Sequence, residues 1–168
     1  GSLADIAARM EALDAKILVT NLEYLGTGET YLKNSTKYEI VEIGGKKIAL
    51  LGIVTPETIT KAEPGLFMDG DEWVYTFHHQ SEAEFYGYIE SVVDEVTKAG
   101  ADYVIALAHM GDDPASAPWT STELAANVKG IDAILDGHSH STVPCRIVND
   151  PNGDPVFIGS TGTKLTNI

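Results

Sequence analysis

Three of the five histidines follow apolar runs, at the points where two predicted strands end. Residues 105–108 (IALA) lead directly into His109, and residues 133–135 (AIL) are followed within a few residues by His138 and His140. In open α/β sheets, ligands bind where the carboxyl ends of the strands converge, so neighbouring strands would aim these imidazoles at one place. Neutral imidazole binds zinc, manganese and iron. The pattern predicts a metal site that uses all three histidines.

The spacing of the histidine pair supports this prediction. In an extended segment, side chains two residues apart point the same way, so His138 and His140 would reach one region while Ser139 turns aside. Gly137 would allow the backbone to turn sharply just before them. A single histidine after a strand, like His109, or an isolated H-x-H motif has many structural explanations. Their conjunction at the ends of two apolar strands favours metal binding.

Other polar residues near these motifs have simpler interpretations. His78 and His79 lie in a polar stretch before a predicted helix and are interpreted as ordinary loop residues. Asp112 and Asp113 follow His109 and could line a pocket, although a solvated loop is the favoured interpretation. These four residues are therefore left out of the predicted site.

Two more residues are interpreted as structural. Asp136 precedes Gly137 and is expected to accept hydrogen bonds from backbone donors of the turn. Cys145 is expected to be buried in a strand, without a role as ligand or nucleophile. As the only cysteine, it excludes an internal disulfide and any cysteine-rich zinc site.

Helices and strands that could position the histidines are readable from apolar spacing. Helical periodicity and capping signals predict helices over 3–13, 81–99 and 121–128. In the second of these, Ser81 with Glu84 fits a capping box and Gly100 fits the stop. Strands are predicted over 16–20, 37–43, 46–54, 102–108, 131–135, 144–148 and 155–158.

The order of these elements indicates the fold class. Gly44-Gly45 predicts a hairpin turn, and Asn152-Gly153 predicts the turn of a closing strand pair. Residues 22–36, 55–80 and 110–120 are interpreted as loops or irregular segments. Strands that alternate with helices in the middle and form hairpins at both ends indicate an α/β fold with a mixed sheet. The apolar strands need cover on both faces.

Composition narrows the possible classes of protein. The chain has 168 residues, 43% of them hydrophobic and 21% charged, as expected for one soluble globular domain. A net charge of −14 opposes binding to nucleic acid or to anionic membranes. No apolar run approaches the ~18 residues of a transmembrane helix, so no membrane insertion is expected. Gly1-Ser2 resembles a tag remnant, so the lack of a signal peptide in this sequence says little about the location of the protein.

The two histidine motifs resemble a known family. Residues 104–111 (VIALAHMG) and 132–140 (DAILDGHSH) are similar to the last two signature blocks of calcineurin-like metallophosphoesterases. Residues 47–58 (KIALLGIVTPET), 15–24 (AKILVTNLEY) and 156–168 (VFIGSTGTKLTNI) resemble segments of the 5′-nucleotidase, UDP-sugar hydrolase and 2′,3′-cyclic phosphodiesterase branch. The likeness thus extends from about residue 3 to residue 168 and is most specific at the histidines.

The resemblance implies that the chain is part of a four-layer α/β/β/α sandwich with mixed sheets. It also implies a site with two divalent metal ions in the full-length protein, with partial or no occupancy in this chain. By match to the family, His109 and His138 would bind one ion and His140 the other. Zinc, manganese and iron all suit these ligands. The resemblance also implies nucleotides or related phosphoesters as substrates. It further implies a periplasmic, secreted or cell-surface location.

The family's other blocks are absent from this chain. Its Asp-x-His, Gly-Asp and Gly-Asn-His-Glu blocks, which carry the bridging aspartate and the catalytic histidine, are expected upstream. Its nucleotide-binding C-terminal domain is also absent. Residues 1–168 are therefore predicted to form the C-terminal portion of the catalytic domain, with no catalytic residue of their own and little activity alone. The exposed sheet edge that this leaves would allow a dimer.

Two other interpretations stay open at this point. One is a non-catalytic binding or interaction module that keeps the fold and a residual metal site. The other is a purely structural α/β domain whose histidines are hydrogen-bonded loop residues. An upstream sequence without the family's aspartates would favour the first, and a complete lack of metal binding would favour the second.

Overall fold

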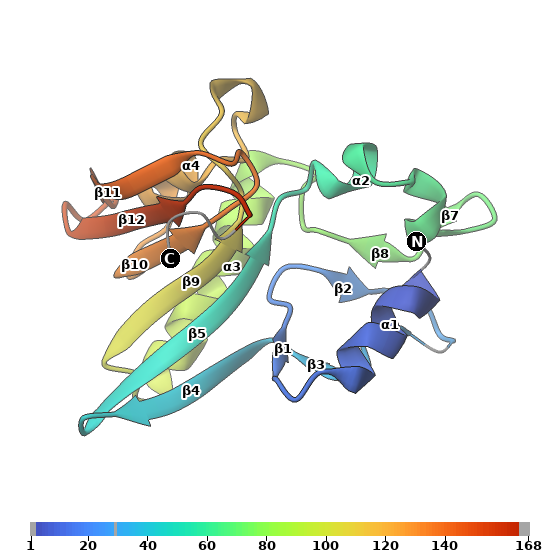
Figure 1. Cartoon of the computed structure of the whole chain (residues 1–168), viewed down its shortest axis with the longest axis horizontal. Coiled ribbons are helices and arrows are strands. Elements are labelled where there is room, and N and C mark those ends of the chain that lie inside the picture. The colour runs from blue at the N-terminus through green and yellow to red at the C-terminus, as the bar shows by residue number, and fades with distance from the viewer. Residues whose placement is uncertain (1–2, 29, 165–168) are drawn as a thin grey trace.

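A computed structural model describes residues 3–28 and 30–164, and its centre is a six-stranded mixed sheet (Figure 1). The strand order is β11-β12-β10-β9-β5-β4. The four inner strands run parallel, and each edge strand is antiparallel to its neighbour. The predicted tag remnant and the end of the closing segment, residues 165–168, lie outside the described residues.

The strands of this sheet are β4 (Tyr38–Ile43), β5 (Lys46–Val54), β9 (Tyr103–His109), β10 (Ala133–Asp136), β11 (Thr142–Asn149) and β12 (Pro155–Thr161). The helices are α1 (Leu3–Ala12), α2 (Thr58–Lys61), α3 (Glu82–Lys98) and α4 (Ser121–Asn127), with 3-10 turns η1 (Pro64–Phe67) and η2 (Pro114–Ser116). Short strands are β1 (Ile17–Leu18), β2 (Glu23–Tyr24), β3 (Ser35–Thr36), β6 (Met68–Asp69), β7 (Glu72–Trp73) and β8 (Tyr75–Thr76).

The long helix α3 forms as its capping signals predict. Ser81 accepts a hydrogen bond from the Glu84 backbone N–H, and the Glu84 carboxylate accepts one from the Gln80 N–H. Gly100 ends the helix with φ +95°, a conformation that favours glycine. The apolar side of α3, which includes Phe85 and Ile89, is fully buried in the main core.

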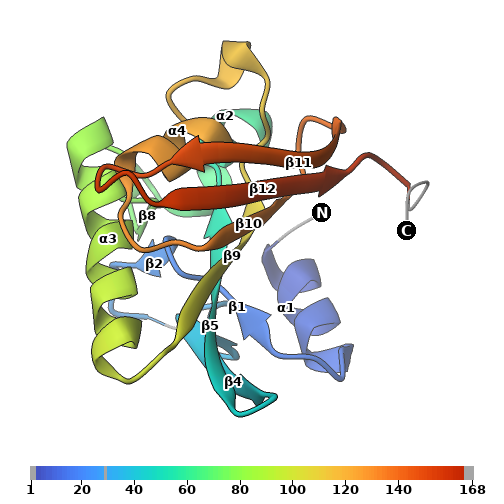
Figure 2. The ribbon, with the colours of Figure 1, turned by 90° about the vertical axis from the view of Figure 1, so that its left-hand side faces the viewer.

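That core lies between the sheet and the helices α3 and α4, which cover the same face (Figure 2). Alternate residues of the strands point into it, because successive side chains of a strand point to opposite faces. The inward-pointing side chains of Leu51, Ala106 and Ile134 are fully buried. The predicted α/β class with a mixed sheet is therefore confirmed, and α3 and α4 form a helical layer on one face of the six-stranded sheet.

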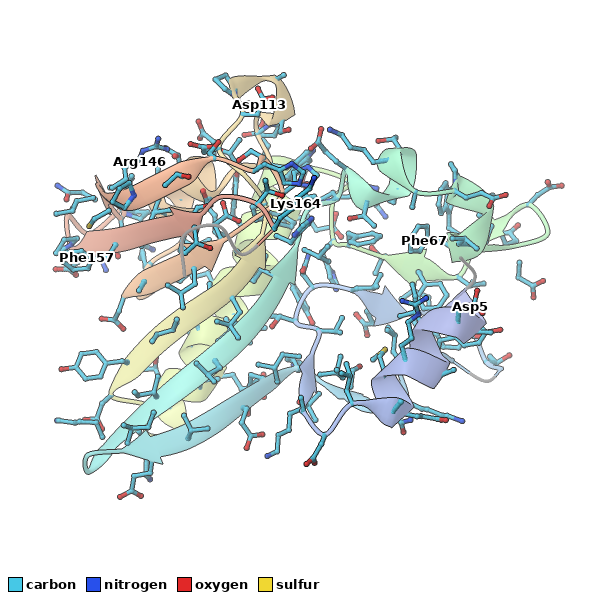
Figure 3. The ribbon with its side chains drawn as sticks, viewed as in Figure 1. Asp5, Phe67, Asp113, Arg146, Phe157 and Lys164 are labelled. Atoms are coloured by element: carbon cyan, nitrogen blue, oxygen red, sulfur yellow. The ribbon has the colours of Figure 1, made fainter. Side chains whose placement is uncertain are left out.

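Among the described residues, no helix covers the opposite face of the sheet along β9, β10 and β12. Leu107, Leu135 and Phe157 point to this face and are 39%, 55% and 48% exposed. Figure 3 shows Phe157 near the outer end of the sheet. We call these three side chains the open apolar face.

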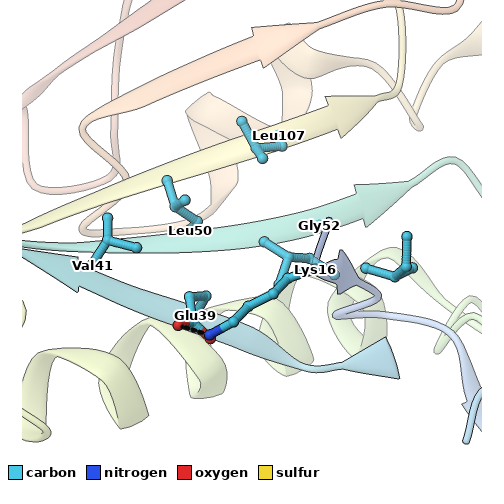
Figure 4. A pocket seen from close by; sticks show the side chains of 8 residues that line it. Lys16, Glu39, Val41, Leu50, Gly52 and Leu107 are labelled. Atoms are coloured by element: carbon cyan, nitrogen blue, oxygen red, sulfur yellow. Dashed lines mark hydrogen bonds and ion pairs between the residues drawn. The ribbon is translucent and has the colours of Figure 1, made fainter. Parts of the chain in front are cut away.

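A pocket continues this face toward β1, where Lys16 pairs with Glu39 (Figure 4). Leu50, Gly52 and Leu107 line it from the sheet side.

The segments predicted as loops hold short strand pairs. β1 covers only part of the predicted strand 16–20 and pairs with β3, inside the predicted loop 22–36. β2 pairs with β8, and β6 with β7, within segments that were expected to be irregular. The first two pairs depend on partners distant in the chain, whereas β6 and β7 form a local two-residue hairpin. Two-residue strands are too short for apolar periodicity to reveal. A second small core of Ile59, Phe67, Tyr75 and Phe77 packs beneath this region.

Candidate metal-binding site

His109 is the last residue of β9 and lies at the carboxyl edge of the parallel strands. It pairs in register with Val54 of β5, and its backbone C=O accepts a hydrogen bond from the Thr55 N–H. Strand alternation places its ring on the face that Leu107 occupies, not on the core face. The histidine predicted from the sequence thus stands at the predicted edge, on the uncovered side of the sheet.

His138 and His140 lie in the loop between β10 and β11, and the expectation of an extended segment is wrong. Their φ angles are +80° and +59°, in the left-handed region that non-glycine residues seldom occupy. The side chain of Ser139 turns toward Asp112, to which it donates a hydrogen bond of 2.8 Å. The loop is therefore a curved backbone held by specific contacts.

Two of the three predicted histidines meet. The ring centroids of His109 and His138 are 4.9 Å apart at an interplanar angle of 64°. The side chain of His138 is only 18% exposed, whereas His140 is exposed. The charge of His140 nevertheless acts on His109, whose pKa it lowers.

A carboxylate that the sequence analysis missed contacts this pair. Glu57 Oε2 lies 3.2 Å from His138 Nε2, and the Glu57 side chain is 19% exposed. Its other oxygen lies 3.7 Å from Lys61 Nζ. Glu57 follows the carboxyl end of β5, the neighbour of β9, so the argument applied to His109 would have found it. Residues 55–80 were instead interpreted as irregular.

Asp136 accepts backbone hydrogen bonds, as predicted. Its Oδ1 lies 2.8 Å from the Gly137 N. The same oxygen also accepts from the N–H groups of Met110 and Gly111, in the loop that follows His109. The sequence predicted bonds within the turn of Asp136 only, whereas these two bonds join that turn to the loop after His109.

Asp112 is not part of a solvated loop, contrary to the favoured interpretation. It accepts from Ser139 Oγ at 2.8 Å and forms an ion pair of 3.2 Å with Arg146 of β11. Hydrogen bonds from Ser141 and Ser139, with the nearby guanidinium of Arg146, lower its pKa below the ordinary value. Asp113 caps the turn η2 by accepting from the Ala115 N–H, and Figure 3 shows it on an outer loop.

The remaining candidates lie apart from the histidine pair. His78 stacks on Tyr88 with ring centroids 3.6 Å apart and lies 3.1 Å from Glu23 Oε2, so it is packed and not an ordinary loop residue. Burial lowers the pKa of His79. Cys145 lies in β11 but is exposed, so the expected burial is wrong. In this edge strand, with one neighbour and an open side, alternation alone does not ensure burial.

The electrostatics at His109 suit a neutral imidazole. Partial burial lowers the pKa of His109 below its ordinary value of 6.5, and the neighbouring His138 and His140 lower it further, while Asp136 raises it. The neutral ring is the form that binds a metal ion. Within residues 3–28 and 30–164, no three His, Cys, Asp or Glu side chains lie at ligand spacing. The described residues alone therefore do not complete a metal site, and the predicted use of all three histidines stays a prediction.

The chain matches one family model over most of its length. The model is described as "Bacterial capsule synthesis protein PGA_cap" and matches residues 10–160.

Individual relatives are phosphoesterases. The chain is 30% identical over 122 residues to the trifunctional nucleotide phosphoesterase protein YfkN of Bacillus subtilis (strain 168), covering 72% of this chain and 7% of that protein. It is 30% identical over 155 residues to a 2′,3′-cyclic-nucleotide 2′-phosphodiesterase/3′-nucleotidase of Haemophilus influenzae, covering 83% of this chain and 21% of that protein. The chain thus spans a small part of these relatives.

The fold has a counterpart among solved structures. A 5′-nucleotidase precursor from Thermus thermophilus superposes with a TM-score of 0.71 at 20% identity, covering 96% of this chain and 31% of that chain. At this identity the likeness concerns the fold alone. Among the described residues, no helix is long and apolar enough to span a membrane.

Proposed function

Because the chain belongs to the PGA_cap family and to the 5′-nucleotidase branch of the calcineurin-like phosphoesterases, we propose that it supplies part of a metal-dependent site that hydrolyses nucleotide phosphoesters. The observation that carries the proposal is the meeting of the His109 and His138 rings, 4.9 Å apart, at the carboxyl edge of parallel strands. This edge is where ligands bind in open α/β sheets.

His109, His138 and His140 would hold the metal, with the first two sharing one ion and the third on a second. Divalent ions such as zinc, manganese or iron would polarise a phosphate and make bound water acidic. The chain's own contribution is to bring the imidazoles of His109, at the end of β9, and His138, in the loop after β10, into contact. Glu57 adds a carboxylate next to the His138 ring.

Nucleotides are the proposed substrates because two relatives are named for nucleotide hydrolysis. The chain's charge of −14 would repel a phosphoester, so bound cations would be needed for favourable substrate binding. We assign no catalytic residue within the chain and propose that its activity depends on ligands outside residues 1–168. A periplasmic, secreted or cell-surface location is part of the same proposal, supported by the precursor among its structural relatives.

Metal retention tests the site directly. The chain is incubated with Mn²⁺ or Zn²⁺, desalted and analysed by mass spectrometry beside a variant with His109, His138 and His140 replaced by alanine. A second variant with His78 and His79 replaced by alanine is the matched control, since these histidines lie apart from the pair. Because other ligands are expected outside this chain, we expect partial occupancy or none in the wild type. Where the wild type retains metal, the control should retain the same amount and the triple variant none. Equal retention of bound metal in all three would refute the assignment of the ligands.

Hydrolysis is tested in a longer polypeptide that joins this chain to a Gly-Asn-His-Glu block. Phosphate release from AMP should require the three histidines. Metal retention without release from any nucleotide would instead support a non-catalytic binding module.

We also propose a dimer through an open edge of the six-stranded sheet. The edge strands are β4 and β11, whose outer backbone groups face away from the sheet. Sedimentation velocity over a concentration series tests this, and a single monomeric species throughout would contradict it.

A further inference from the structure

We propose that Asp136 is a positioning residue that holds the loop after His109 and the loop of His138 against each other. This inference rests on the proposed function only in treating the histidines as ligands. The positions of the two histidine rings are those of the protein without metal.

The contacts of Asp136 join two segments that are distant in sequence. Its Oδ1 accepts from the Gly137 N–H at 2.8 Å, the Met110 N–H at 2.9 Å and the Gly111 N–H at 3.2 Å. Met110 directly follows His109, and Gly137 directly precedes His138. A single carboxylate oxygen therefore fixes the backbone beside both candidate ligands, and hydrogen bonds to an ionised group are the stronger kind.

The two loops lie close together, and a side chain at Gly111 would press against the loop of His138. A Cβ atom on Gly111 would lie 3.2 Å from the Ser139 Cβ and 3.3 Å from His138 Cδ2. A Cβ atom on Gly137 would lie 3.4 Å from His109 Nδ1. Contact between the rings thus depends on keeping this narrow separation, which the Asp136 hydrogen bonds span.

The backbone at His138 is also held in a conformation that needs support. Gly111 has φ +77° and His138 has φ +80°. For histidine this left-handed conformation is unfavourable, and it persists only where surrounding contacts determine it. Asp136 accepts hydrogen bonds from Gly111 itself and from the residue before His138, so it acts where this support is needed.

A matched control lies at the other end of the same two strands. Asp132 Oδ2 accepts from the Val104 N–H at 2.7 Å, joining the segment before β10 to the start of β9. Asp132 and Asp136 therefore both connect β10 to β9 through a backbone N–H. Only Asp136 does so beside the histidines, so a general loss of strand pairing can be separated from a loss of positioning.

The test is NMR on metal-free protein. We measure the nuclear Overhauser effect between the ring protons of His109 and His138 in wild type, Asp136→Ala, Asp136→Asn and Asp132→Ala, with far-UV circular dichroism to verify folding. We expect Asp136→Ala to lose the ring contact and to shift the amide signals of Met110, Gly111 and Gly137. Asp136→Asn should keep the contact because its Oδ1 still accepts. Asp132→Ala should shift the Val104 amide and keep the contact.

The opposite results overturn the proposal. The proposal is wrong if the contact between the His109 and His138 rings survives in folded Asp136→Ala. It is also wrong if Asp132→Ala loses this contact to the same extent. Should Asp136→Ala not fold, Asp136→Glu replaces it, because an added methylene group displaces the carboxylate without removing its charge. A contact that persists in folded Asp136→Glu, with unchanged amide signals, also overturns the proposal.

Calorimetric titration with Mn²⁺ provides a second readout. Affinity should fall about 10- to 100-fold in Asp136→Ala, as is usual when a residue supporting a metal ligand is removed, and stay unchanged in Asp132→Ala. If the isolated wild-type chain binds no Mn²⁺, its three histidines do not hold the ion without further ligands. The ring contact still decides the role of Asp136 in that case.

Discussion

The ring of His138 lies between two neighbours of different chemistry, the imidazole of His109 and the carboxylate of Glu57. His109 ends β9 and Glu57 follows the end of β5, so three strand ends converge at the ring of His138. The sequence predicted site residues at the ends of β9 and β10. It did not predict one after β5, where Glu57 lies.

We expect Glu57→Ala to lower the free energy of unfolding by about 1 kcal/mol, because a largely buried imidazole nitrogen loses its partner. Lys61→Ala is the control, since it removes the other contact of Glu57, a partly exposed ion pair of little energetic value. Urea denaturation of both variants measures the difference. An equal effect of the two substitutions would show that the contact with His138 contributes nothing.

Among the elements, the crossing of β1 over β5 depends on one glycine. A Cβ atom on Gly52 would lie 2.2 Å from the backbone oxygen of Leu18, and backbone cannot move aside as a flexible side chain can. Thr20 strengthens the crossing, since its N–H donates to the Gly52 oxygen at 2.7 Å and its hydroxyl accepts from the Gly52 N–H at 2.9 Å.

Gly52→Ala should therefore destabilise the protein by about 1–3 kcal/mol, the usual cost of overpacking. Gly87→Ala should have the opposite sign, a gain of about 0.5–1 kcal/mol, because Gly87 lies in α3 with open space around it. Thermal unfolding of the two variants gives both signs in one experiment. A neutral Gly52→Ala would mean that β1 can move away from β5.

The elements also show what sequence can predict. The long apolar strands 46–54, 102–108 and 131–135 and the helix 81–99 were predictable, because burial imposes a period along the chain itself. The pairing of β1 with β3 was not, since two-residue strands carry no period and depend on a distant partner. The left-handed backbone of His138 was hidden for another reason: tertiary contacts override the ordinary preference of a non-glycine residue.

For the whole molecule, the asymmetry of the sheet is the dominant feature. One face is packed against α3 and α4, while Leu107 and Leu135 lie side by side on the open apolar face. Exposed apolar patches of this kind bind hydrophobic probes.

We expect replacement of Leu107 and Leu135 by lysine to reduce the fluorescence of an added hydrophobic dye such as ANS. The free energy of unfolding should change by less than about 0.5 kcal/mol per site, since both side chains are already partly solvated. Leu25→Lys, which replaces a leucine that is 57% exposed elsewhere, is the control and should leave the fluorescence unchanged. Unchanged fluorescence in the double variant would place the dye elsewhere.

The positive φ angles of His138 and His140 imply that selection for stability and selection for histidine favour different residues at these two positions. Glycine adopts this conformation without the steric cost of about 1 kcal/mol that a side chain incurs. His140→Gly should therefore raise the melting temperature, and a lower one would refute the idea. A library selected for thermostability alone would drift toward glycine at these two positions and erase the imidazoles, whereas a lineage that keeps histidine there trades stability for their chemistry.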